Sequence, residues 1–312
     1  MISTSVQRIF TLEFDASDVY IVNFADMTGK ISSLSKVHVA VMFFGLSGLF
    51  GKWLSLPPSL ITWGRCSFAF VALFFLILFS KERFLLRQMG HYFVFAVLGI
   101  LLALHWWSFF YSIQISTVAV GLLTFSTFPV FAVFLEPLFF KEKIRWADII
   151  AACITFGGIA CIVPWFDISQ TTTVGAIFGV ISGLSFAMLQ ILNRKYVQAY
   201  SGRLITFYQT GIAALVLLPA VSFTQTSFTI PDLLMLMVLG VVCTATAHSL
   251  FISGLRSVQL RSASIIAGLE PVYGIVFAML LLGEMPSWKE ICGGMVILIM
   301  ATYVSVRKRL SS

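Results

Sequence analysis

The sequence predicts an all-α integral membrane protein with ten transmembrane helices, arranged as two five-helix inverted repeats. Apolar residues make up 59% of the 312 residues and charged residues only 11%, and the mean hydropathy is +0.98. So little polar surface cannot coat a water-soluble globule, which makes lipid the expected solvent. From Lys36 onward, apolar runs of about 16–23 residues recur, and about twenty helical residues cross a hydrocarbon core roughly 30 Å thick.

Short polar segments divide the chain into the ten predicted spans and their flanking parts. Residues 1–35 carry four acidic residues and resemble neither a signal peptide nor a spanning helix, so we expect a disordered cytoplasmic tail. Residues 36–165 and 174–306 form the two repeats, and residues 307–312 form a basic cytoplasmic tail. The predicted spans are Val37–Leu54, Ser59–Ser80, Tyr92–Ile113, Val118–Phe140, Ala147–Trp165, Val174–Leu192, Leu204–Phe223, Leu233–Ile252, Ser262–Leu282 and Trp288–Val306.

A stretch that occurs twice indicates the repeat. The segments 128–149 and 270–291 are related by a fixed offset of 142 residues, and each places a proline in an apolar helix that closes with a glutamate. An offset held over six identities favours an ancestral duplication. The identical pairs are Pro129 and Pro271, Val130 and Val272, Leu138 and Leu280, Glu142 and Glu284, Trp146 and Trp288, and Ile149 and Ile291.

The basic residues predict the orientation. With the amino terminus in the cytoplasm, seventeen of the twenty lysines and arginines fall on the inner side, whereas only Lys52 and Lys289 fall outside and Arg65 lies within a span. This bias places both termini in the cytoplasm. Since each half has an odd number of spans, the second half must be inverted. The net charge of +7 does not indicate nucleic-acid binding, because the basic residues form short clusters without a contiguous basic face.

These residues resemble the drug/metabolite transporter superfamily, EamA type. The likeness lies in the stretches Ser116–Val163 and Ser257–Tyr303, centred on STFPVFAVFLEPLFFKEK and AGLEPVYGIVFAMLLLGE. The resemblance implies a bacterial inner-membrane carrier with a central cavity lined by helices one, three, four, six, eight and nine. Lys141 stands where the second copy has Gly283, so the motif is looser in the first half.

Two charged residues inside predicted spans are the first candidates for binding or coupling. A charged side chain at mid-bilayer costs roughly 2.5–3.5 kcal/mol on insertion scales, so it should face a partner or water. Glu270, directly before Pro271, is a candidate for binding a cation or taking up a proton; alternatively, it fixes helix packing. Arg65 is a candidate clamp for a substrate carboxylate, or else a scaffold residue that reaches toward the interface.

Aromatic and polar side chains supply the other candidates. His105, Trp106, Trp107 and Tyr111 crowd the outer end of the third span, where they form either a stacking surface for an aromatic or amine-bearing solute or an interfacial aromatic belt. Trp107 and Tyr111, four residues apart, share a helix face. The weaker candidates are His248, Gln190, Gln209 and Tyr273, and Glu136 is expected near the cytoplasmic edge.

No catalytic motif competes with transport. The sequence lacks a phosphate loop, an HExxH motif, a serine elbow and a cysteine–histidine cluster with metal-ligand spacing, so we expect no enzyme activity, cofactor or metal. The predicted function is a secondary transporter that exports small metabolites such as amino acids or amines across the inner membrane, with protons as a candidate coupling partner. The alternatives are a passive facilitator or channel and an integral-membrane lipid-modifying enzyme, for which Glu270 with His248 is the one remote candidate pair.

Overall fold

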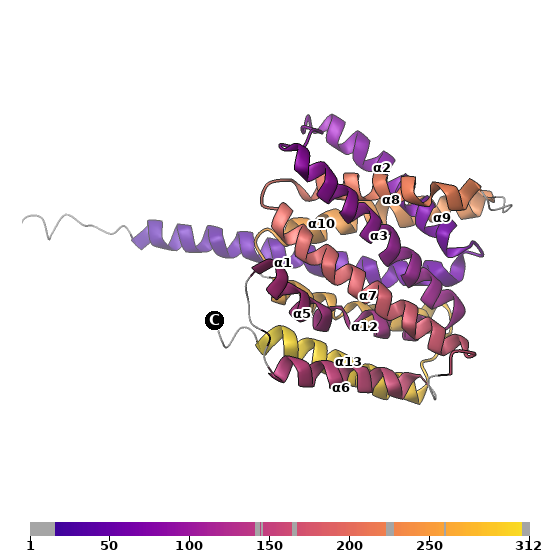
Figure 1. Ribbon diagram of the computed structural model, residues 1–312. Helices are drawn as coiled ribbons and strands as arrows, with labels where there is room; N and C mark the ends of the chain where they lie inside the picture. Colours follow the sequence, from indigo (N-terminus) through magenta and orange to yellow (C-terminus); the bar gives the residue numbers. More distant parts are fainter. Residues whose placement is uncertain are drawn as a thin grey trace, which may run out of the picture.

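The computed structural model describes residues 16–140, 144, 146–163, 167–222, 228–258 and 260–307. Within these ranges the chain is helical, with no strand, and the helices run side by side as a bundle (Figure 1). The helices are α1 (Ala16–Trp53), α2 (Pro58–Phe79), α3 (Met89–Ile115), α4 (Val118–Phe125), α5 (Phe128–Phe140), α6 (Trp146–Ile162), α7 (Thr171–Tyr196), α8 (Gly202–Ser222), α9 (Ile230–Gly240), the π-helix η1 (Val241–Thr246), α10 (Ala247–Gly254), α11 (Leu260–Ala267), α12 (Glu270–Leu281) and α13 (Trp288–Arg307).

The first helix is longer than the sequence led us to expect. Helix α1 begins at Ala16 and projects beyond the other helices (Figure 1), whereas the sequence predicted a disordered tail up to residue 35. Residues 16–35 contain no proline and a single glycine, Gly29, so the chain keeps helical hydrogen bonding upstream of the bundle. The expectation of disorder is therefore wrong from Ala16 onward, and residues 1–15 lie outside the described residues.

Seven segments in the described part of the chain are long and apolar enough to cross a bilayer. Two shorter apolar helices, Trp146–Ile162 and Ile265–Leu281, and α13 lie where the remaining predicted spans fall. Large apolar side chains such as Phe79, Leu215 and Ile299 are 78%, 69% and 60% exposed, as expected for a lipid-facing surface. The seven segments are Ser33–Trp53, Pro58–Phe79, Met89–Ile115, Val118–Phe139, Thr171–Tyr196, Gly202–Ser222 and Ile230–Gly254.

Three of the predicted spans are interrupted. The fourth breaks between α4 and α5, directly before Pro129, and the ninth breaks between α11 and α12, directly before Pro271. A proline has no amide hydrogen to donate, so both breaks follow from the repeated sequence motif. The eighth widens into η1, where Thr244 Oγ1 donates to the carbonyl of Leu239 at 2.8 Å, five residues earlier.

Helices from the two halves pack against one another. Pairs with extensive contacts include α3 with α7, α2 with α8, α6 with α13 and α1 with α12. Small residues permit these approaches: a methyl group added at Gly45 of α1 would lie 2.9 Å from the Glu270 carbonyl oxygen of α12. A methyl group at Gly183 of α7 would lie 2.7 Å from the Phe125 carbonyl oxygen of α4. The prolines and glycines thus bring the broken helices to the centre of the bundle.

Candidate functional site

A small polar cavity lies where α1, α2, α3, α4, α7, α10 and α12 meet. Its ten lining residues are between 1% and 7% exposed, so the cavity is buried within the bundle. The volume accessible to the centre of a water-sized sphere is about 20 Å³, which is enough for one water molecule. A metabolite would therefore need the helices to separate. The lining residues are Phe44, Ser47, Arg65, His105, Trp106, Phe109, Phe125, Phe186, His248 and Glu270.

Arg65 of α2 is the cation of the site and is 1% exposed. Its Nε donates to Thr244 Oγ1 of η1 at 3.0 Å, and its guanidinium carbon lies 3.8 Å from the centroid of the Trp106 ring. A cation over an indole face is attracted by the ring quadrupole, and the interaction strengthens when water is excluded. Nη1 has no hydrogen-bond partner within the described residues, so its two N–H groups remain available for a ligand.

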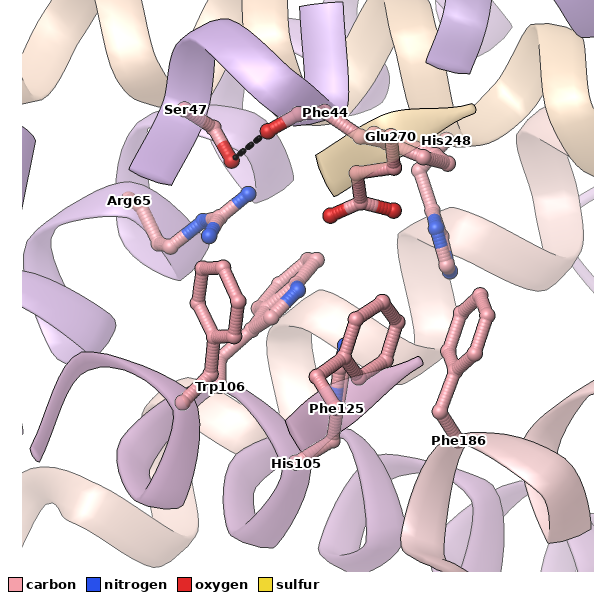
Figure 2. Close-up of a pocket in the computed structure, with 10 residues that line it drawn as sticks. Phe44, Ser47, Arg65, His105, Trp106, Phe125, Phe186, His248 and Glu270 are labelled. Carbon is pink, nitrogen blue, oxygen red and sulfur yellow. Dashed lines mark hydrogen bonds between the residues drawn. The ribbon is translucent and has the colours of Figure 1, made fainter. Parts of the chain in front are cut away.

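Glu270 is the anion of the site and is 5% exposed. It is the first residue of α12, where the positive end of the helix dipole favours a carboxylate. Its side chain points toward the guanidinium of Arg65 across the cavity (Figure 2). In the described part of the chain, no ion pair or side-chain hydrogen bond holds this carboxylate. The two buried opposite charges face one another without closing a direct salt bridge.

Aromatic rings surround this pair. His105 of α3 stacks on Phe186 of α7 with ring centroids 4.9 Å apart, and it lies 5.3 Å from Phe125 of α4. Its Nδ1 is 2.7 Å from Ser182 Oγ, which in turn donates to the His105 carbonyl at 3.0 Å. Because these bonds tie α3 to α7, His105 holds the two halves together as well as lining the cavity.

His248 connects the cavity to a series of buried, hydrogen-bonded polar side chains. Its Nε2 donates to Gln209 Oε1 at 3.0 Å, and Gln209 Nε2 donates to Asn193 Oδ1 at 2.5 Å. All three residues are 2% exposed or less, and they come from α10, α8 and α7. These hydrogen bonds link the histidine in the cavity wall to the interior of the second half.

Other predicted site residues lie away from the cavity lining. Trp107 and Tyr111 do share a face, with rings stacked at 5.7 Å, but they pack against Phe178 of α7. Tyr273 is partly buried beside Gly45. Gln190 is 1% exposed, and neither of its amide atoms has a partner within the described residues. Glu136, expected in solvent near the cytoplasmic edge, is instead 7% exposed with a polar contact, because it lies in α5 within the bundle.

Sequence reasoning missed two polar contributors, Thr244 and Asn193. Thr244 supports Arg65 only because η1 turns its hydroxyl inward, and a π-helix leaves no pattern in the sequence. Asn193, three residues after Gln190 on α7, carried a detectable signal: it is an amide near the end of an apolar run.

At the end of the bundle where α4 begins, acidic side chains connect the two halves. Glu284, which follows α12, accepts a hydrogen bond from the backbone N–H of Val118 at 2.6 Å. Glu290 of α13 accepts one from Thr117 Oγ1 at 2.5 Å. Lys52 Nζ donates to the carbonyl of Ser116 at 2.7 Å. These bonds hold the end of α1 and the α12–α13 connection against the α3–α4 junction, and so close this end of the molecule.

The fold and the site together define a multi-pass helical membrane protein with broken helices around a buried polar centre, an arrangement used by secondary transporters. The model of the EamA-like transporter family matches residues 33–163 and again residues 173–306, and the chain belongs to this family. The resemblance read from the sequence is thereby confirmed, including the presence of two repeats.

Curated relatives carry transporter names. An uncharacterized transporter, YxxF, of Bacillus subtilis is 25% identical over 90% of this chain and 91% of its own length. An S-adenosylmethionine uptake transporter of Rickettsia bellii is 26% identical over 67% of this chain and 71% of its own length. A solved crystal structure superposes with a TM-score of 0.64 at 15% identity, covering 90% of this chain and 99% of that one, which shows a shared fold.

Proposed function

We propose that this protein is a secondary transporter that exports small amine-bearing metabolites of the amino-acid class by alternating access. The observation that carries the proposal is the buried pair of opposite charges, Arg65 and Glu270, which face one another across the cavity without an ion pair in the described residues. Separate buried charges are expensive in lipid unless they bind something. A solute with both a carboxylate and an ammonium group satisfies both charges.

Each charge has a distinct role in this proposal. The free Nη1 donor of Arg65 suits a substrate carboxylate, because a guanidinium binds carboxylate oxygens strongly. Glu270 suits the ammonium group, or a proton that takes its place once the substrate has left. The aromatic rings of Trp106, Phe125 and Phe186 favour a substrate with an apolar or cationic portion.

The membrane arrangement proposed for this function is ten spans in two inverted five-helix repeats. In support, the start of α1 and the end of α13 lie on the same side of the bundle (Figure 1), as an even number of spans requires. The packing of α1 on α12 in the second half also has a counterpart in the packing of α7 on α5, the helix that the 142-residue offset relates to α12. We propose that both termini face the cytoplasm of a cell whose inner membrane holds the protein.

The Rickettsia relatives support the substrate class but suggest the opposite direction. Their names describe uptake of S-adenosylmethionine, an amino-acid derivative with an added sulfonium charge. A substrate of that kind presents a carboxylate and two cationic groups, which fits a site with one arginine, one glutamate and several aromatic rings. Export remains the direction proposed for this chain, and flux measurements decide it.

Counterflow into proteoliposomes tests the proposal. Purified protein is screened against amino acids, S-adenosylmethionine, amines, nucleobases and neutral sugars, with an imposed proton gradient in parallel. We expect exchange of amine-bearing solutes and gradient-dependent net flux in the export direction. Exchange of neutral sugars alone would refute the substrate class, and substrate flux that ignores the proton gradient would favour a facilitator.

A further inference from the structure

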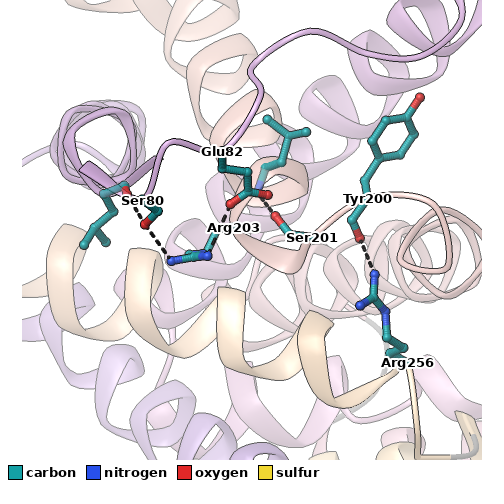
Figure 3. Close-up of polar contacts among 8 residues, drawn as sticks. Ser80, Glu82, Tyr200, Ser201, Arg203 and Arg256 are labelled. Atoms are coloured by element: carbon teal, nitrogen blue, oxygen red, sulfur yellow. Dashed lines mark hydrogen bonds and ion pairs between the residues drawn. The ribbon is translucent and has the colours of Figure 1, made fainter. Parts of the chain in front are cut away.

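A second cavity lies at the end of the bundle where α2 ends and α8 begins, far along the helices from the central site. It has a volume of about 940 Å³ and lies between the α2–α3 loop, the α7–α8 turn and the end of α10. Figure 3 shows part of its wall. Consecutive spans α1 and α2 run in opposite directions, so this end is the one where α1 begins. The lining residues are Glu82, Arg83, Phe84, Leu85, Leu86, Arg87, Ala199, Tyr200, Ser201, Leu204 and Arg256.

The pocket carries an excess of positive charge. Its single acid, Glu82, is already paired with Arg203 at 3.3 Å. Arg256 is fixed by neutral groups, since its Nε donates to the carbonyl of Val197 at 3.0 Å and its Nη2 donates to the carbonyl of Tyr200 at 3.4 Å. Figure 3 shows the bond to Tyr200. Within the described residues, no acidic side chain compensates the charge of Arg256.

Two further arginines in the pocket wall are free. Arg83 and Arg87 are exposed, and within the described residues neither side chain contacts a carboxylate. Together with Arg256 they give three cations without an acidic partner around one concave space. Guanidinium groups in this arrangement match the oxygens of a phosphate group.

The α2–α3 loop, which carries Arg83 and Arg87, is held in place before any ligand binds. The backbone N–H of Arg87 donates to Tyr200 Oη at 2.9 Å, and His91 Nδ1 lies 2.6 Å from the same hydroxyl. The backbone N–H of Leu86 donates to Tyr92 Oη at 3.2 Å. A preformed wall loses little conformational entropy on binding, which favours affinity.

Apolar side chains beside the arginines point to a lipid as the occupant. Phe79, Leu85 and Met89 are 78%, 77% and 85% exposed, although each lies within a few residues of Arg83 or Arg87. In water such exposure would be unfavourable, whereas at a bilayer surface the apolar side chains enter the acyl region and the arginines remain at the headgroups. These apolar side chains would contribute nothing to the binding of a free phosphate ion.

We propose that the pocket formed by Arg83, Arg87 and Arg256 binds the headgroup of an anionic phospholipid. Basic pockets between spanning helices at the cytoplasmic surface are suited to such headgroups. This site is separate from the transport cavity, and it does not depend on the substrate assigned there. A bound lipid would brace the α2–α3 loop against the α7–α8 turn and thereby join the two halves.

Thermal unfolding of the delipidated full-length protein tests the proposal. We expect added phosphatidylglycerol to raise the melting temperature saturably, whereas phosphatidylcholine and inorganic phosphate do not. The double variant Arg83→Gln/Arg87→Gln should bind phosphatidylglycerol about thirty-fold more weakly, from roughly 1 kcal/mol for each interfacial arginine. The matched control Lys36→Gln/Lys289→Gln removes the same charge from exposed positions outside the pocket and should bind like the wild type.

Several outcomes would overturn the assignment. Equal stabilisation of the wild type by phosphatidylglycerol and phosphatidylcholine would show that the pocket does not select an anionic lipid. Equal stabilisation by inorganic phosphate would make it a free-anion site. Equal losses in the arginine and lysine variants would reduce the effect to overall charge. The wild-type comparisons stand on their own even if the double variant fails to fold.

Discussion

The contact between α1 and α12 beside Glu270 gives a prediction with a calculable size. A β-carbon at Gly45 would lie 2.9 Å from the Glu270 carbonyl oxygen, the Gly274 nitrogen and the Tyr273 Cβ. Two of these atoms belong to the backbone of α12, so they cannot rotate away as a flexible side chain would. Gly45→Ala must therefore push α1 and α12 apart at the level of the cavity.

The magnitude follows from comparison with Gly157→Ala in α6, where an added methyl group meets nothing within 4 Å. Both substitutions gain the same helix propensity, up to about 1 kcal/mol. That gain cancels in the comparison, which leaves the overpacking penalty of roughly 1–3 kcal/mol at Gly45. At ~2–4 °C for each kcal/mol, Gly45→Ala should melt roughly 2–12 °C below Gly157→Ala.

Melting of the two purified variants in the same detergent measures this difference. Gly45→Ala should also reduce transport, because the displaced α12 carries Glu270, whereas Gly157→Ala should transport like the wild type. Variants that melt within about 1 °C of one another, with equal transport, would show that α1 and α12 do not pack as described.

Three further predictions concern the orientation in the membrane, the closed end of the bundle at Glu284, and the contact of Arg65 with Trp106. In a cysteine-free background, Gln198→Cys should be shielded from an impermeant thiol reagent in intact cells and Ser169→Cys should react; the reverse pattern would refute the proposed orientation. Glu284→Gln should weaken the hydrogen bond from the Val118 N–H, because charged acceptors bind an N–H about twice as strongly as neutral ones. The thiol reagent should then reach cysteines placed in the central cavity more readily. Unchanged access would argue against a role of Glu284 in closing this end. Trp106→Leu should lower the melting temperature by roughly 2–8 °C through loss of a cation–π contact of up to ~2 kcal/mol, and melting unchanged from wild type would contradict that contact.

Much of the architecture could be predicted because lipid imposes strong rules on sequence. Long apolar runs indicated the membrane helices, and the repeated Pro129 and Pro271 lie at the points where two spans, predicted as continuous, are broken in the structure. The same rules made Arg65 and Glu270 conspicuous, since a charge within an apolar run requires a reason. The structure places both in one cavity, although 205 positions separate them in the sequence.

The details of the site could not be predicted because α3 is apolar on nearly every side. Neighbouring residues on a helix point about 100° apart, so the choice between Trp106 and Trp107 decides which ring meets the arginine. Without an amphipathic pattern, the sequence offered no way to choose, and Trp106 is the ring found over Arg65. Likewise, no local signal joins Arg65 to Thr244, 179 residues away.

Transport by Glu270→Gln tests the central claim most directly, because the substitution keeps the shape of the side chain and removes its charge. The exposed Asp167→Asn in the α6–α7 connection is the matched carboxylate-to-amide control. In proteoliposomes, the account predicts normal yield of Glu270→Gln protein and loss of proton-driven export, with wild-type behaviour for Asp167→Asn. Glu270→Gln protein that exports at the wild-type rate, with an unchanged dependence on pH, would contradict the proposed mechanism.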